Sequence, residues 1–175
     1  MKLSKPQIGY LIAVSVLALD QAIKATFLYG LNWIASRDGL PVQPIEVAPF
    51  FDFVMVWNQG ISYGLLQASS DFERWLLTFF AVGVISFLIW WLRGVQDLRL
   101  AQAIGLIIGG AVGNVIDRML YGAVADFFHL HAFGYSWYVF NIADTAVVLG
   151  VAVMGFDLAL SEWRARMHGA KEDQT

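Results

Sequence analysis

The chain has 175 residues, of which 58% are hydrophobic and only 14% are charged, and its formal net charge is −3. Soluble domains carry about 25% charged residues, so this composition excludes a soluble body with an ordinary polar surface, and the acidic balance leaves no basic surface for nucleic acid. The absence of cysteine excludes disulfides, a thiol nucleophile and cysteine-ligated metal centres. The composition therefore predicts an integral membrane protein.

Four apolar segments are each long enough to cross the hydrocarbon core of a bilayer, which takes about 20 residues. They cover residues 7–28, 75–92, 100–116 and 138–160. Lys2 and Lys5 precede the first segment as in a signal peptide, but no cleavage site follows it, so we expect a retained helix. Continuous apolar runs also exclude a membrane β-barrel, whose strands alternate. The predicted fold is an all-α bundle of four transmembrane helices in one membrane domain, residues 1–165.

The connection between the first two predicted helices, residues 29–74, is too long for a simple link and too apolar to be disordered. Within it, residues 51–57 form a β-like run that two glycines follow, and three prolines before the run mark turns. We expect a short hairpin or small sheet here, on the extracytoplasmic surface. At the other end of the chain, residues 166–175 form a polar tail that we expect to be frayed.

Lysine and arginine are distributed unevenly over the connections. Seven lie in the N-terminal residues, the 93–99 connection and the tail, whereas four lie toward the other end of the bundle. Because positively charged connections stay in the cytoplasm, both termini are predicted to be cytoplasmic, with residues 29–74 and 117–137 on the outer side.

Polar residues at membrane depth are costly and point to function. Most of those in this chain fall toward the predicted outer side. Asn114 and Arg118 are four residues apart and share one helix face, whereas Asn141 and Asp144 are three apart and share another. Because the third and fourth helices are antiparallel neighbours, these faces can meet in a polar pocket just beneath the outer interface.

Two carboxylates, Asp126 and Asp144, are eighteen residues apart, across the loop that returns the chain to the membrane. In an apolar setting two carboxylates can share one proton, so that the ionised one activates water while the protonated one donates to a carbonyl oxygen. The spacing leaves a second interpretation open, in which Asp144 pairs with Arg118 in a buried salt bridge and Asp126 is a solvated loop residue.

Other catalytic groups have weaker support. No HExxH motif is present, so the ligands of an intramembrane zinc protease are missing. His129 and His131 can be drawn as metal ligands with Asp126, but an HxH near an interface is more often a surface pair, and we expect no metal. Ser62 and Ser86 have no evident base nearby in the sequence.

Five short blocks of residues between positions 20 and 144 form a recognisable set. They are Asp20-Gln21-x-x-Lys24, Asn58-x-Gly60-x-x-Tyr63-Gly64, Gly109-Gly110-Ala111-x-Gly113-Asn114-x-x-Asp117-Arg118, Val124-x-Asp126-Phe127 and Phe140-Asn141-x-Ala143-Asp144. In this order, and with this helix count and chain length, the chain resembles the lipoprotein signal peptidase (signal peptidase II) family. It departs from the family pattern at Tyr63, where Phe is most common, and at Tyr138, where Pro is common.

The resemblance implies an aspartic endopeptidase of the bacterial cytoplasmic (inner) membrane. It would remove the signal peptide from diacylglyceryl-modified prolipoproteins, cutting before the lipidated cysteine, with Asp126 and Asp144 as the catalytic pair and no metal or other cofactor. Substrate-binding or supporting positions are then expected at Asp20, Lys24, Asn58, Gly60, Asn114, Arg118 and Asn141. The expected partners are the prolipoprotein and membrane lipid, with no nucleic acid and no obligate protein partner.

A small proton-coupled membrane transporter or channel is the alternative function. Its relay would run through Asp20, Lys24, Asp117, Arg118 and Asp144. Such a relay needs polar residues through the full depth of the bundle, but the predicted cytoplasmic halves of the second and third helices are purely apolar. A structural subunit, the third possibility, would leave the clustered outer Asp and Asn residues unexplained.

Overall fold

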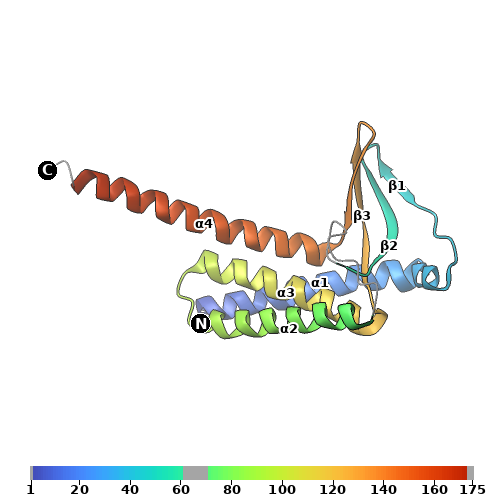
Figure 1. The fold of residues 1–175 in the computed structure, drawn as a ribbon, viewed down its shortest axis with the longest axis horizontal. Helices are drawn as coiled ribbons and strands as arrows, with labels where there is room; N and C mark the ends of the chain where they lie inside the picture. Colours follow the sequence, from blue (N-terminus) through green and yellow to red (C-terminus); the bar gives the residue numbers. More distant parts are fainter. Residues whose placement is uncertain (1, 61–70, 173–175) are drawn as a thin grey trace.

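The computed structural model of the chain describes residues 2–60 and 71–172. In this part of the chain four helices are long and apolar enough to cross a membrane. They are α1 (Lys5–Ala25), which continues into the π-helical turn η1 (Thr26–Gly30), α2 (Asp71–Leu92), α3 (Leu98–Tyr121) and α4 (Ile142–Glu172). Helix α3 is central and packs against the other three, while α4 leans away from the bundle toward its C-terminal end (Figure 1).

Small residues allow α3 to approach its neighbours closely. A Cβ atom on Gly105 would overlap the backbone of Gly9 on α1, and one on Gly110 would overlap the carbonyl oxygen of Ala143 on α4. Close backbone approach of this kind is a main source of helix association in lipid, where burial of apolar surface adds little. These glycines therefore set how near α1 and α4 come to the two faces of α3.

The ends of α3 follow from local sequence. The Asp97 side chain accepts a hydrogen bond from the Leu100 amide at 2.8 Å, which caps the N-terminus of the helix. At the other end Gly122 has the left-handed conformation, with φ of 74°, that often terminates a helix. Helix α3 thus extends past residue 116, where the apolar run ends, and includes Asp117 and Arg118.

A four-stranded antiparallel sheet stands at one end of the bundle, which we call the sheet end; the start of α1 and the end of α4 lie toward the opposite end (Figure 1). Its strands, in spatial order, are β1 (Ile45–Ala48), β2 (Phe51–Asn58), β3 (Val124–Ala132) and β4 (Tyr135–Phe140). Half of the sheet therefore comes from the connection between α3 and α4, whereas the sequence predicted β structure only between residues 29 and 74. The pairing of β2 with β3 joins segments far apart in the chain, so no local pattern indicates it.

Two further boundaries differ from the prediction. The fourth helix begins at Ile142 and not near residue 138, because residues 138–140 pair with β3 as part of β4. Hydropathy detects apolar residues without distinguishing a helix from a buried strand, which explains the error. The polar tail expected to be frayed is helical as far as Glu172.

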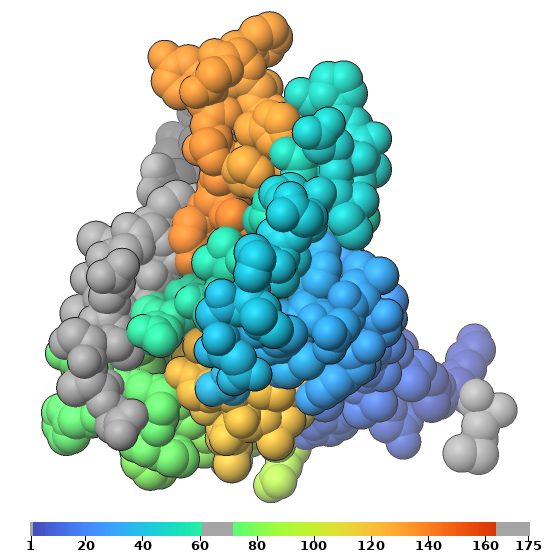
Figure 2. Space-filling model, turned by 90° about the vertical axis from the view of Figure 1, so that its right-hand side faces the viewer, coloured from blue at the N-terminus to red at the C-terminus, as the bar shows by residue number. Residues whose placement is uncertain are grey.

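An aromatic cluster fixes the sheet on the end of α1. Phe27, in η1, stacks on Phe127 of β3 with ring centroids 4.6 Å apart and also meets Phe53 of β2 edge-on at 5.0 Å. Trp33, in the 3₁₀ turn η2 (Trp33–Asp38), is buried against the same rings. Figure 2 faces this end, where the β3–β4 hairpin projects beyond the residues that follow α1.

Candidate active site

Asp126 and Asp144 are brought together at the sheet end by a single residue, Asn141. Its side-chain nitrogen Nδ2 donates to Asp126 Oδ1 at 2.6 Å, and its backbone N–H donates to Asp144 Oδ2 at 3.3 Å. Asp126, on β3, is fully buried, and Asp144, in the first turn of α4, is half-buried. The two carboxylates that are eighteen residues apart in sequence therefore share one hydrogen-bonding partner.

Asn141 holds this position because it caps α4. Its Oδ1 accepts a hydrogen bond from the Asp144 amide at 2.8 Å, while the Asp144 carboxylate accepts from the Asn141 amide. This reciprocal pair is the arrangement of a capping box, and the N-terminal end of a helix favours a negative charge. The three-residue spacing of Asn141 and Asp144 is thus a helix cap as well as a shared face.

Two more asparagines complete the hydrogen bonds to the carboxylates. Asn114 on α3 donates from Nδ2 to Asp144 Oδ1 at 2.8 Å, and its Oδ1 accepts from Asn141 at 3.2 Å. Asn58, at the end of β2, donates from Nδ2 to Asp126 Oδ2 at 3.0 Å. Each carboxylate therefore has an amide donor on both of its oxygens.

Gly60 and Arg118 connect the end of β2 to α3. The Gly60 amide donates to Asn58 Oδ1 at 3.1 Å, and the Gly60 carbonyl accepts from Arg118 Nη2 at 3.1 Å. Arg118 Nη1 also donates to the Asn114 carbonyl at 3.4 Å. Within the described residues Arg118 forms no ion pair with Asp144, so the structure does not contain the salt bridge that the spacing had left open.

Lys24 lies beneath this cluster between two carboxylates. Its Nζ is 2.8 Å from Asp20 Oδ2 and 2.7 Å from Asp117 Oδ2, and all three side chains are at least 97% buried. Asp20 Oδ1 accepts from the Ala143 amide at 3.0 Å, and Asp117 Oδ2 accepts from the Ala125 amide at 3.1 Å. Each of these aspartates thus holds the backbone of the residue directly before Asp144 or Asp126.

Three residues of the site were not predicted to support it. Asp117 was considered only as part of a transport relay, although its place in the third motif block is a signal for it. Gln21 donates to both Asp20 and Asp117, at 3.2 and 3.3 Å. The Tyr138 hydroxyl lies within hydrogen-bonding distance of the Asn58 amide, a contact that sequence alone does not indicate. Ser62, Tyr63 and Gly64 lie outside the described residues.

The electrostatic environment favours a protonated Asp126. Burial, and next the negative charge of Asp144, raise the pKa of Asp126 from its ordinary value of 3.8 to about 8. Hydrogen bonds from Asn58 and Asn141 act in the opposite direction and only partly offset these effects. Burial beside a second carboxylate is the setting in which two carboxyl groups can share one proton.

Within the residues whose burial the structure describes, buried charge is confined to this end of the bundle. Among the described residues the charged side chains that are buried are Asp20, Lys24, Asp117 and Asp126. They form one cluster and no relay across the bundle, so the structure gives no support to the transport alternative. The metal site considered from the sequence, in which His129 and His131 join Asp126, is not formed either. Both Asp126 oxygens accept from asparagine amides, and the two histidines lie next to Asp52.

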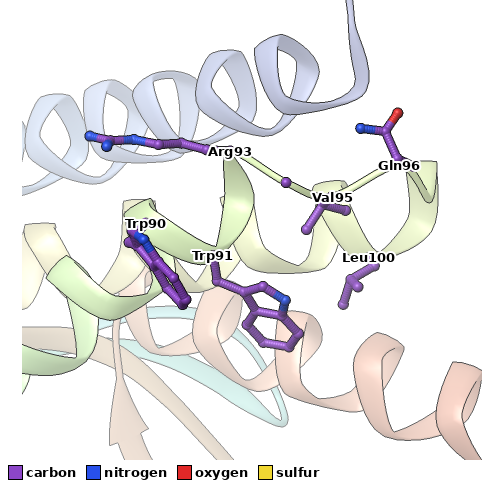
Figure 3. A pocket seen from close by; sticks show the side chains of 7 residues that line it. Trp90, Trp91, Arg93, Val95, Gln96 and Leu100 are labelled. Atoms are coloured by element: carbon purple, nitrogen blue, oxygen red, sulfur yellow. The ribbon is translucent and has the colours of Figure 1, made fainter.

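An open pocket of about 670 Å³ lies at the opposite end, where α2 turns into α3 (Figure 3). Its lining residues are Trp90, Trp91, Arg93, Gly94, Val95, Gln96 and Leu100. None of these carries a carboxylate, so this pocket offers no groups for hydrolysis by an aspartate pair.

Comparison with known proteins gives a consistent result. The family described as signal peptidase (SPase) II matches residues 12–160. Lipoprotein signal peptidase of Methylorubrum extorquens (strain PA1) is 47% identical over 149 residues, covering 85% of this chain and 84% of its own length. Lipoprotein signal peptidase of Methylobacterium radiotolerans is 49% identical over 143 residues, covering 82% and 80%.

Solved structures agree with this result. Two structures described as bacterial membrane enzymes, solved by the in meso method, superpose with TM-scores of 0.70 and 0.68 at 29% and 30% identity. The alignments cover 88% and 86% of this chain and 88% and 91% of the solved chains. The chain therefore belongs to the signal peptidase II family of multi-pass bacterial membrane proteins, aspartic peptidases that process lipoproteins.

Proposed function

We propose that Asp126 and Asp144 form the catalytic pair of this peptidase, and that its substrate is a diacylglyceryl-modified prolipoprotein cut before the lipidated cysteine. The observation that carries the proposal is the pair of carboxylates held by Asn141, with an amide donor on every oxygen. Family membership supports the same reaction.

In the proposed mechanism the two carboxyl groups have different roles. Asp144, at the N-terminal end of α4, is ionised and removes a proton from water, whose oxygen attacks the carbonyl carbon of the scissile bond. Asp126 holds the shared proton and donates it to the carbonyl oxygen, as its raised pKa allows. The tetrahedral intermediate then collapses with cleavage of the C–N bond. The proton held by Asp144 passes to the leaving nitrogen, and one hydroxyl of the intermediate returns a proton to Asp126 as the C=O bond re-forms.

The supporting residues keep this geometry in place. Asn58, Asn114 and Asn141 fix the orientation of the two carboxylates. Lys24 pairs with Asp20 and Asp117, and these two aspartates fix the backbone next to the catalytic carboxylates. Arg118 donates to the Gly60 carbonyl. Gly60 has no side chain, which lets substrate approach the end of β2 closely. We assign these residues to positioning and substrate binding.

The proposed setting is the bacterial cytoplasmic membrane, with both termini in the cytoplasm and the sheet end at the outer face. The excess of Lys and Arg at the end of the bundle opposite the sheet supports this orientation. A signal peptide is itself a membrane helix, so its scissile bond would then lie near the outer interface, beside the two carboxylates.

The test is a cleavage assay on purified protein with a synthetic diacylglyceryl prolipoprotein. Asp126→Asn and Asp144→Asn should each lower kcat by at least roughly 10²–10⁴-fold, because an amide keeps the shape but cannot transfer the proton. Asp157→Asn is the matched control, since Asp157 lies on α4 but pairs only at the surface with Arg99, and it should cleave normally. Near-normal turnover in either of the first two variants, with folding confirmed by circular dichroism, would rule out the pair. Cleavage should also continue in EDTA.

A further inference from the structure

A second cluster of chemically reactive side chains lies on the sheet, apart from the two carboxylates. Asp52 of β2 is paired directly with His129 of β3, and His131 is two residues further along β3 on the same face. Asp52 Oδ2 is 2.8 Å from His131 Nε2 and 3.9 Å from His129 Nδ1. One ligand atom from each of the three side chains lies within 4.8 Å of the others, so the three side chains form one cluster.

The spacing of these atoms suits a small divalent cation. Zinc binds His nitrogen and Asp oxygen at about 2.0–2.2 Å in a tetrahedron, which places neighbouring ligand atoms about 3.3 Å apart. The distances of 2.8 and 3.9 Å lie on either side of that value. Modest side-chain rotation is therefore sufficient to enclose a cation.

A second observation is the state of His131 Nε2. The atom is buried and forms no hydrogen bond of acceptable geometry, although Asp52 Oδ2 is 2.8 Å away. A buried ring nitrogen without a hydrogen-bond partner is costly unless something else occupies its lone pair or proton. This nitrogen lies within 4.8 Å of the other two ligand atoms.

The surroundings of His129 complete the pattern. Its other ring nitrogen, Nε2, is 2.6 Å from the Ser136 hydroxyl of β4. Metal-binding histidines usually use their second ring nitrogen in such a hydrogen bond, which fixes the orientation of the ring. With Nε2 bonded to Ser136, Nδ1 is the nitrogen left facing Asp52 and His131.

We propose that Asp52, His129 and His131 bind one divalent transition-metal ion with the ligand preference of zinc. Its fourth position is open to water, since all three side chains are partly exposed, between 17% and 32%. The ion would tie β2 to β3, the strands that carry Asn58 and Asp126, and Ser136 would add β4. Its role is to stabilise the sheet, and the proteolytic step does not pass through it.

The test uses the full chain, purified in detergent without a histidine tag and freed of metal by chelation. Titration calorimetry with Zn²⁺ should give one site per chain, and Zn²⁺ but not Mg²⁺ should raise the thermal midpoint of unfolding. His129→Gln and His131→Gln should each weaken binding by more than about 100-fold, and Ser136→Ala by about 10–100-fold. His168→Gln, which removes the third histidine of the chain, is the matched control and should bind normally.

Two results would overturn the proposal. One is the absence of saturable Zn²⁺ binding by the wild-type chain, and the other is equal binding by wild type and both histidine variants, which would mean adventitious surface binding. If the variants do not fold, Co²⁺ added to the wild-type chain decides the question. A tetrahedral site gives an intense visible absorption spectrum that Zn²⁺ abolishes, and a spectrum like that of free aqueous Co²⁺ would contradict the site. Because the readouts are metal binding and unfolding, failure here leaves the catalytic pair untouched.

Discussion

At the scale of single residues, Asn141 has two separate tasks. Its side-chain oxygen caps α4 and its side-chain nitrogen reaches Asp126, so one amide joins the start of a helix to a strand. Ser and Asp can also cap a helix, but neither offers an N–H₂ group, so neither can perform both tasks. The two tasks can therefore be separated by substitution.

Asn141→Ser should retain the cap and lose the donor to Asp126, whereas Asn141→Ala should lose both. We expect kcat to fall by about 10²-fold in each variant, since the carboxylates are no longer held in position. The Ala variant should be less stable than the Ser variant by roughly 1 kcal/mol. Measuring kcat and the free energy of unfolding of both variants under the same conditions checks these two expectations. Normal turnover in Asn141→Ser would show that the amide is dispensable for catalysis.

The raised pKa of Asp126 predicts a pH dependence. If Asp126 supplies the proton, kcat/KM should fall as the pH rises above about 8, where the group becomes ionised. The same shift affects folding: the folded chain holds a proton that the unfolded chain releases near 3.8, so this group's contribution to the free energy of unfolding should decrease as the pH rises from 3.8 to about 8. A pH–rate profile that continues to rise above about pH 8 would contradict the assignment.

At the scale of helices and strands, the site depends on close packing. The amide of Ala143 is held by Asp20 of α1, and its carbonyl lies against Gly110 of α3. Ala143 directly precedes Asp144, so the distance between α3 and α4 determines the position of one carboxylate. The apolar layer farther along the bundle, which includes Leu88 of α2 and Ile104 of α3, keeps α3 fixed from the other side.

Gly110→Ala should therefore reduce both stability and cleavage. The new methyl group would overlap the Ala143 carbonyl oxygen, so α4 has to move, and overpacking of this kind costs roughly 1–3 kcal/mol. Gly155→Ala is the matched control, because nothing lies within 4 Å of a Cβ placed there on α4, and alanine in a helix is favoured over glycine by roughly 0.5–1 kcal/mol. Equal unfolding midpoints for the two variants would show that α3 and α4 are not packed this tightly.

At the scale of the whole molecule, the protein presents large apolar side chains on two kinds of surface. Along the helices, Phe79 and Phe80 of α2 and Phe156 of α4 are more than two-thirds exposed, as suits a surface in contact with lipid tails. At the sheet end, Tyr135 and Trp137 of β4 are also exposed, and aromatic residues of this type favour the membrane interface.

A substrate whose acyl chains remain in lipid gains binding energy away from the bond that is cut, and that energy can be used to position the bond. We therefore expect kcat/KM to be far larger for a diacylglyceryl prolipoprotein than for the same peptide without lipid. The measurement compares the two substrates at matched concentration in the same detergent. Equal values would show that the lipid is not recognised and would favour general signal-peptide cleavage.

Much of the architecture could be predicted from the sequence because it depends on local composition. Continuous apolar runs predict membrane helices wherever they occur, and the part of the chain that the structure describes contains four where four were expected. The motif blocks likewise identified the family, since residue types at fixed spacing are themselves sequence information. The same local reasoning placed Asp126 and Asp144 among the candidates from their charge and apolar surroundings.

Only the tertiary structure decided which of these residues meet. Asp20 binds the backbone of Ala143, 123 positions later in the chain, and Asn58 reaches Asp126 across 68 positions. His129 and His131, which the sequence suggested as possible partners of Asp126, lie next to Asp52 of β2 instead. Such contacts follow from strand register and helix spacing, which are set by packing over the whole chain, and a local window of residues carries no information about them.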